Sequence, residues 1–139
     1  MRCWITGEVL EDSGEASHII PRRYANLFTS GTEFHNLVIA TNEPPFTVDN
    51  ISNGCYIRAD LHMLFDKWAL GVCEDDGDVF KVWAFTSEAQ DFHGRELTFR
   101  PGQTHQHPSP LFCEWHFRQC LFYRMNGEEE ESDDELDYT

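Results

Sequence analysis

Short apolar runs separated by turn-forming residues predict a chain of mixed strands and helices. The runs at 3–6 and 16–20 lie on either side of turn formers at 12–14, so they predict a short extended pair. Another apolar run, at 36–41, predicts a strand inside the mixed segment from 22 to 53. A connection as long as that segment usually carries a function or holds a partner.

The middle of the chain predicts a strand followed directly by a helix. Asn53-Gly54 is a turn signal, and residues 55–58 have the composition of a short strand. Asp60 is placed to cap a helix that begins at Leu61, because apolar residues recur three and four positions after that leucine. The helix is therefore expected to have one apolar face.

The second half of the chain is predicted to add a hairpin and a helix. Alternating apolar residues at 68–73 and 79–85 flank the acidic, glycine-containing turn at 74–78, which is a hairpin pattern. After a polar loop at 100–110, residues 111–125 carry apolar side chains at helical spacing. The expected fold class is α+β, with this last helix closing the core.

Length and composition favour one folded domain. The chain has 139 residues and 40% hydrophobic residues, among them 11 Phe, 4 Trp and 4 Tyr, which is enough to build one core. No stretch is apolar for long enough to span a membrane, and the first residues lack the basic start and apolar block of a signal peptide. We expect an intracellular protein, cytoplasmic or nuclear, that does not interact with membranes.

The charge of the chain is strongly acidic and unevenly distributed. Ten Lys and Arg stand against 25 Asp and Glu, which gives −15, and eight of the acids fall within residues 127–139. Such a segment buries nothing, so it is predicted to be a disordered acidic tail. The rest has 17 acids (25 − 8) against ten bases. Any nucleic-acid binding therefore depends on a local cluster of basic residues.

Cysteine usage predicts reduced thiols. The count is odd, no CxxC pair occurs, and no signal peptide is recognised, which favours a reducing compartment. A structural zinc domain built from scattered Cys and His remains an alternative. The cysteines concerned are Cys3, Cys55, Cys73, Cys113 and Cys120.

A histidine and a carboxylate share one face of the predicted central helix. His62 and Asp66 are four residues apart, so both side chains can bind the same divalent cation and leave coordination positions open. Open positions are what a catalytic metal needs. The alternative for such a pair is an ordinary hydrogen bond or ion pair on the helix surface.

A second histidine lies beside paired arginines. His18 ends a predicted strand, and an imidazole side chain can take a proton from water near neutral pH. Arg22 and Arg23 follow closely and could hold a phosphodiester. Arg58 could also reach a phosphate from the strand before the helix. Alternatively, the histidine is an ordinary hydrogen-bonded residue and the arginines are solvated surface charges.

The order of these residues resembles a known family. His18 in EASHIIP, Asn53 in NG and His62 in DLHMLFD resemble the H, N and H of the HNH endonucleases, in particular an HNH-2-type branch found often in fungal proteins. The opening CWITG at residues 3–7 is similar too. The resemblance covers residues 3–72, so we expect one domain over 1–126, with an extension from 73 to 126.

The resemblance implies a site and a reaction. The family fold is a ββα-metal (His-Me finger) element, here with an additional hairpin and a C-terminal packing helix. His18 would be the general base, and Asn53 would fix the loop and strand that carry it. His62 would ligate one divalent ion, Mg²⁺, Mn²⁺ or Zn²⁺, with Asp66 as its helical companion. The implied activity is metal-dependent hydrolysis of phosphodiester bonds in nucleic acid, with DNA favoured over RNA. The sequence leaves the oligomeric state open, with a dimer as one option.

One departure from the commoner family pattern lies directly before the expected base; another is the lack of paired CxxC motifs. Many members place an acid or histidine directly before the base as a metal ligand, whereas this chain has Ser17. Glu15, two residues earlier on the same strand face, could replace that ligand or hydrogen-bond the histidine; alternatively it is solvated and water fills the position. The serine also leaves open a catalytically degenerate HNH fold that acts as a binding module.

Overall fold

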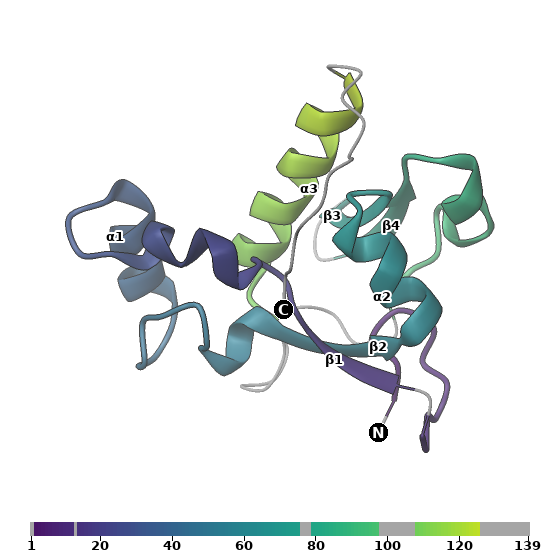
Figure 1. Cartoon of the computed structure of the whole chain (residues 1–139), viewed down its shortest axis with the longest axis horizontal. Coiled ribbons are helices and arrows are strands. Elements are labelled where there is room, and N and C mark those ends of the chain that lie inside the picture. The colour runs from purple at the N-terminus through teal and green to yellow at the C-terminus, as the bar shows by residue number, and fades with distance from the viewer. Residues whose placement is uncertain (1, 13, 76–78, 98–107, 126–139) are drawn as a thin grey trace.

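The computed structural model describes residues 2–12, 14–75, 79–97 and 108–125. In these ranges two separate antiparallel strand pairs combine with helices, so the fold class is α+β as predicted (Figure 1). Among the described helices, none has the length and apolarity to cross a membrane. The predicted acidic tail lies outside the described residues, as does most of the predicted polar loop.

Two strands and the helix that follows them form one compact unit. β1 (Gly14–His18) pairs antiparallel with β2 (Gly54–Arg58), with His18 opposite Gly54. α2 (Ala59–Asp66) begins directly after β2 and packs against both strands, burying Leu61 and Phe65. The predicted strand at 55–58 is confirmed. The predicted helix is also confirmed, but it begins at Ala59, so Asp60 lies in its first turn and is not the predicted cap.

The predicted pairing of residues 3–6 with residues 16–20 is wrong. Residues 3–8 form a turn, in which the Gly7 N–H donates to the Cys3 carbonyl at 2.8 Å and Gly7 has φ +79°. Glycine adopts this left-handed conformation at no steric cost, and the conformation closes the turn. The apolar run at 3–6 therefore does not continue as a strand. The partner of β1 is β2 instead, because this pairing supplies a surface for the apolar face of α2.

The predicted strand at 36–41 is also wrong. These residues belong to α1 (Glu33–Thr41), which follows the short 3-10 helix η1 (Arg22–Phe28). Thr32 caps α1, because its hydroxyl accepts the His35 N–H at 2.9 Å. An N-cap with an acidic first turn outweighs the strand preference of the β-branched residues that follow.

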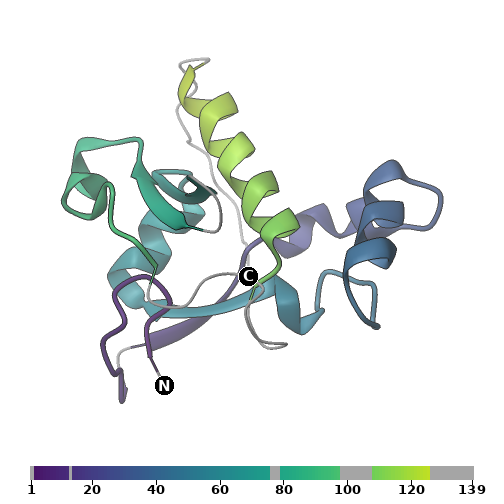
Figure 2. The same ribbon diagram turned by 180° about the vertical axis from the view of Figure 1, so that it is seen from behind.

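The second half of the fold follows its prediction. β3 (Leu70–Glu74) and β4 (Phe80–Ala84) form the expected antiparallel hairpin. α3 (Pro110–Met125) packs along β3, with α1 and the hairpin on opposite sides of it (Figures 1 and 2). Gly71 permits this approach, since a Cβ there would lie 3.2 Å from the Cys120 sulfur.

A buried histidine joins α3 to α2. The His116 ring stacks on Phe65 with 3.7 Å between ring centroids, and its Nε2–H donates to the Phe65 carbonyl at 3.1 Å. Burial lowers the pKa of His116 to about 3, so the ring is neutral at physiological pH. His116 is therefore part of the core rather than of a reactive site.

A buried asparagine connects three segments at the start of β2. Asn53 ends the short helix η2 (Ile51–Asn53) and is fully buried. Its side-chain oxygen accepts the Ile20 N–H at 2.8 Å, and its amide nitrogen donates to the carbonyls of Ile20 at 3.0 Å and Val48 at 2.8 Å. Its own carbonyl accepts the Ile19 N–H at 2.8 Å. One side chain thus fixes the exit of β1 and the loop before β2.

Replacing this asparagine should weaken the fold. Asn53→Ala leaves one N–H and two carbonyls without their buried partner, so we expect the free energy of unfolding to fall by about 3 kcal/mol or more. Urea titration followed by tryptophan fluorescence measures the change. Asn26→Ala, at an exposed position of η1, is the control and should be nearly neutral. Equal effects of the two substitutions would contradict this role for Asn53.

Candidate functional site

One histidine of α2 lies between two carboxylates. His62 Nδ1 is 2.5 Å from Glu15 Oε1 on β1, and His62 Nε2 is 3.1 Å from Asp66 Oδ2 one helical turn later. Side chains alternate along a strand, so Glu15 lies on the β1 face that α2 covers. Because α2 begins at the residue after β2, its first turns lie against this face of β1, and His62 contacts Glu15 there.

These contacts favour the charged form of the histidine. The pKa of His62 is raised from 6.5 to about 9, chiefly by the hydrogen bond to Asp66; burial opposes the shift, and the hydrogen bond to Glu15 adds to it. At neutral pH the ring therefore carries both protons and donates one to each carboxylate. The group is an ion-paired triad of Glu15, His62 and Asp66.

The triad fits a divalent cation only as an open site. Within the described ranges, no three side chains of His, Cys, Asp or Glu are arranged to hold a metal ion. The two carboxylates of the triad lie at different nitrogens of the His62 ring. His62 Nε2 and Asp66 Oδ2 are nevertheless two ligand atoms of the kind that divalent cations bind. In the metal-free protein a proton lies between these two atoms. An ion at His62 would take its remaining ligands from water or phosphate oxygens.

The other candidate histidine lies apart from this triad. His18 is three residues beyond Glu15 on β1, which corresponds to about 10 Å along the strand and to the opposite face. Its Nε2 is 3.1 Å from Asp49 Oδ1, and it makes no hydrogen bond to His62 or Asp66. The structure therefore groups Glu15, His62 and Asp66, and leaves His18 with a partner of its own.

An open cavity surrounds the His18–Asp49 pair. It has a volume of about 700 Å³, and its lining includes Asn53 and Tyr56 as well as the pair itself. The His18 side chain is one-third exposed and that of Asp49 about two-thirds exposed. Sequence reasoning missed Asp49, which lies 31 residues from the histidine with no local motif to connect them. The one sequence signal near this pair is Asn53, whose side chain forms hydrogen bonds with Ile20, close to His18, and with Val48, next to Asp49.

Ser17 is directed toward the core. It is 6% exposed, and its hydroxyl donates to the His18 carbonyl at 3.2 Å. It shares a strand face with Glu15, as the alternation predicts. A buried hydroxyl engaged with the backbone is a poor metal ligand, so the carboxylate at Glu15 is the better donor on this strand.

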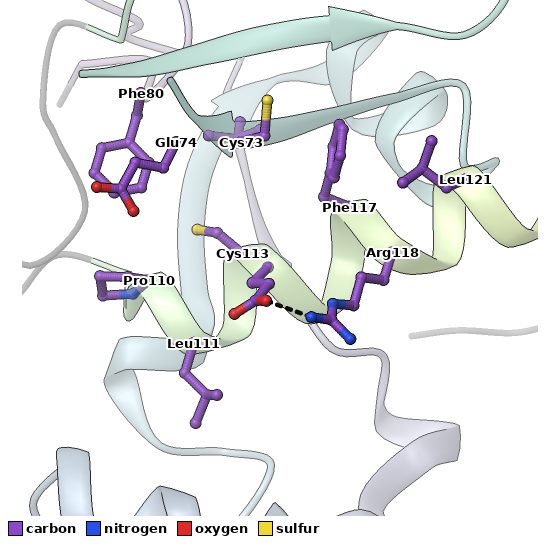
Figure 3. A pocket seen from close by; sticks show the side chains of 11 residues that line it. Cys73, Glu74, Phe80, Pro110, Leu111, Cys113, Phe117, Arg118 and Leu121 are labelled. Carbon is purple, nitrogen blue, oxygen red and sulfur yellow. Dashed lines mark hydrogen bonds and ion pairs between the residues drawn. The ribbon is translucent and has the colours of Figure 1, made fainter. Parts of the chain in front are cut away.

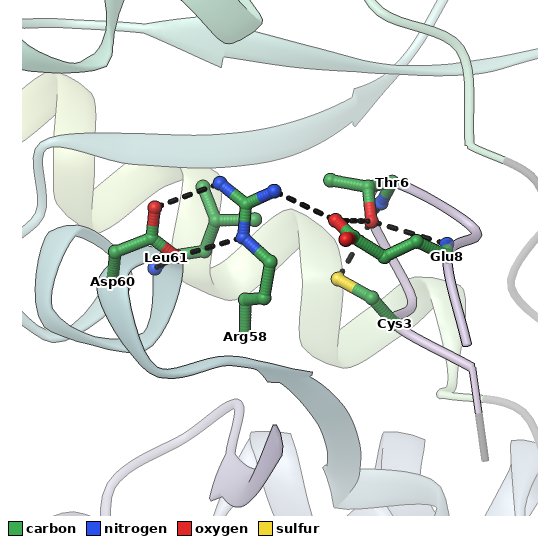
Figure 4. A network of polar contacts seen from close by, with 6 residues as sticks. All are labelled: Cys3, Thr6, Glu8, Arg58, Asp60 and Leu61. Atoms are coloured by element: carbon green, nitrogen blue, oxygen red, sulfur yellow. Dashed lines mark hydrogen bonds and ion pairs between the residues drawn. The ribbon is translucent and has the colours of Figure 1, made fainter. Parts of the chain in front are cut away.

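The arginines differ in their surroundings. Arg58 pairs with Glu8 at 2.6 Å and with Asp60 at 2.7 Å, and these contacts raise its pKa (Figure 4). Two carboxylates already balance this guanidinium, so the structure does not support a phosphate contact there. Arg22 and Arg23 are exposed on η1, and the Arg23 guanidinium lies 5.0 Å from the Tyr24 ring centroid.

Among the described residues, the cysteines are not gathered into a group that could hold a metal ion. All five are free thiols, and no metal-holding group of them exists in the part of the chain that the structure describes. Burial raises the pKa of Cys55, Cys113 and Cys120, so these thiols stay protonated. The described residues therefore contain no grouping that favours the alternative of a structural zinc domain.

A second cavity lies between β3 and the first turns of α3 (Figure 3). It measures about 570 Å³ and is lined mainly by apolar side chains, among them Phe80, Phe117 and Leu121. Its Glu114 and Arg118 pair with each other at 2.8 Å. None of the candidate histidines lines this cavity, so its chemistry differs from that of the cavity around His18.

A family model matches the first half of the chain. The HNH-2 family model, described as HNH endonuclease, matches residues 3–72, which is half of the 139-residue chain. The match includes His18, Asn53 and His62 and ends within β3. Neither the curated proteins nor the solved structures give a match.

The triad should be visible in a pH titration. In metal-free protein, NMR should show the His62 ring losing a proton near pH 9, and Asp66→Asn or Glu15→Gln should lower this midpoint. Because the folded pKa exceeds the ordinary value of 6.5, the contribution to stability is complete below pH 6.5 and is lost as the pH rises to 9. A midpoint that stays near 6.5 would contradict the ion-paired triad.

Proposed function

Because the chain belongs to the HNH endonuclease family, we propose that it is a metal-dependent endonuclease that hydrolyses phosphodiester bonds in nucleic acid, with DNA as the substrate. One observation carries the proposal. The three motif residues fall on a single ββα unit: His18 at the end of β1, Asn53 at the junction before β2, and His62 on α2. We propose that this unit is the ββα-metal (His-Me finger) element of the family.

In this proposal the triad holds the metal ion. His62 and Asp66 are the ligands, and Glu15 is either a further ligand or the group that orients His62. The bound cation supplies Lewis-acid stabilisation of the charge on the scissile phosphate and the leaving oxygen. His62 must release a proton before it can ligate, so metal binding is expected to weaken as the pH falls.

The proposed general base is His18. It lies at the open end of β1 and lines the cavity there, where water can reach it. His18 does not contact the triad, so the scissile phosphate has to lie between the two groups. Contacts of this kind are often long in substrate-free enzymes and shorten when substrate binds.

The proposed phosphate contacts come from the segment after β1. Arg22 and Arg23 are exposed on η1, close in sequence to the base, and guanidinium groups bind phosphate oxygens in pairs. Arg58 is not included among these phosphate contacts, because its guanidinium group already forms ion pairs with Glu8 and Asp60. Positive charge concentrated at η1 would let an otherwise acidic protein approach nucleic acid.

A non-catalytic binding module is the second candidate. Ser17 favours it, since a buried hydroxyl stands where many family members have a metal ligand. The lack of three converging metal donors among the described residues points the same way. This candidate predicts nucleic-acid binding without strand breakage at any metal concentration.

Cleavage of supercoiled plasmid separates these candidates. With Mg²⁺ or Mn²⁺ we expect nicking, which His18→Ala should slow by about 10²–10⁴-fold, as is typical for loss of a general base. His62→Ala should abolish both nicking and Mn²⁺ binding measured by calorimetry. His93→Ala, at an exposed histidine after η3, is the matched control and should nick like the wild type.

Two results would overturn parts of the proposal. Equal nicking by wild type and His18→Ala would show that another group activates the water. DNA binding with no nicking under any divalent metal would favour the binding module. In both cases the unfolding midpoint of each variant has to match the wild type, so that loss of activity is not loss of fold.

A further inference from the structure

Asp49 is placed to control the chemistry of His18. The contact of 3.1 Å joins Asp49 Oδ1 to His18 Nε2, and both side chains line the same open cavity. An ionised carboxylate can only accept a hydrogen bond, so Nε2 must carry the proton of the neutral imidazole. Nδ1 is then the nitrogen with a free lone pair.

The loop that carries Asp49 is fixed by side-chain hydrogen bonds. The Asn50 amide nitrogen donates to the carbonyls of Glu43 and Pro45, and its side-chain oxygen accepts the Ser52 N–H at 2.8 Å. The Asp49 N–H donates to the Thr47 hydroxyl at 3.3 Å. The carboxylate is exposed, but its backbone is held from both sides.

The same buried asparagine also sets the distance between the acid and the histidine. Asn53 donates to the Val48 carbonyl, directly before Asp49, and bonds Ile20 two residues after His18. His18 and Asp49 therefore lie on two segments that are both hydrogen-bonded to the side-chain amide of Asn53. This arrangement is a preorganised pair rather than a chance surface contact.

We propose that Asp49 is the positioning residue for His18: it holds the Nε2–H tautomer and directs Nδ1 toward the attacking water. The inference rests on the proposed function. In the step concerned, one water proton passes to Nδ1 while the water oxygen forms a new bond to phosphorus. The bond from phosphorus to the leaving sugar oxygen breaks, and that oxygen keeps the electron pair and takes a proton from solvent. Asp49 stays ionised and stabilises the imidazolium that forms.

The first test reads the tautomer and needs no activity. Long-range ¹H–¹⁵N NMR of the metal-free protein should show neutral His18 almost entirely as the Nε2–H form. Asp49→Ala should raise the share of the Nδ1–H form to that of an unconstrained histidine, in which it is the minor tautomer. Glu43→Gln is the matched control, because it neutralises another exposed carboxylate in the segment between α1 and η2 and should leave the His18 tautomer unchanged. An unchanged tautomer in Asp49→Ala would overturn the inference, whether or not the protein cuts DNA.

The second test is a double-mutant cycle on plasmid nicking. Asp49→Ala should lower kcat about tenfold with little change in KM, and Asp49→Glu should recover part of the loss. In a His18→Ala background the same substitution should have no further effect, because Asp49 acts only through that histidine. A further loss in that background would overturn the positioning role.

The two tests separate failure of this inference from failure of the proposed function. A tautomer that depends on Asp49, together with nicking that does not depend on His18, would remove the histidine as base and leave the pair without a catalytic role. Nicking that depends on His18 but not on Asp49 would keep the nuclease and overturn the positioning role alone.

Discussion

The side-chain amide of Asn53 is the constraint on which the rest of the site depends. It is fully buried and forms hydrogen bonds with backbone groups of both Ile20 and Val48, which lie in two different segments of the chain. Buried polar groups are costly unless they are paired, so these hydrogen bonds fix a unique arrangement of the loop and the strand end. The position of His18 in the fold follows from this arrangement.

Two histidine–carboxylate contacts lie at different places along β1. The α2-facing side of β1 presents Glu15 to His62, and the contacts with Glu15 and Asp66 make that histidine an imidazolium. At the far end of β1, His18 faces an open cavity and has a carboxylate partner of its own. The two histidines of one unit thus have different carboxylate partners and different surroundings. In the proposed enzyme this difference separates the metal ligand from the base.

Local patterns predicted more of the fold than long-range ones. The β3–β4 hairpin and α3 follow from turn residues and helical spacing, which act within a few positions. The strand predicted at 36–41 failed because the Thr32 cap starts a helix there. The His62–Asp66 pair could be predicted from its spacing of four. The His18–Asp49 contact could not, because it spans 31 residues and depends on how the intervening loop is held.

The most direct test of the account is a crystal structure of the protein grown with Mn²⁺, in which anomalous scattering locates the ion. We expect one ion, bound to a ring nitrogen of His62 and a carboxylate oxygen of Asp66, with an open side that faces solvent. An ion held elsewhere, or a His62 ring that keeps both of its ion pairs at saturating Mn²⁺, would contradict the account.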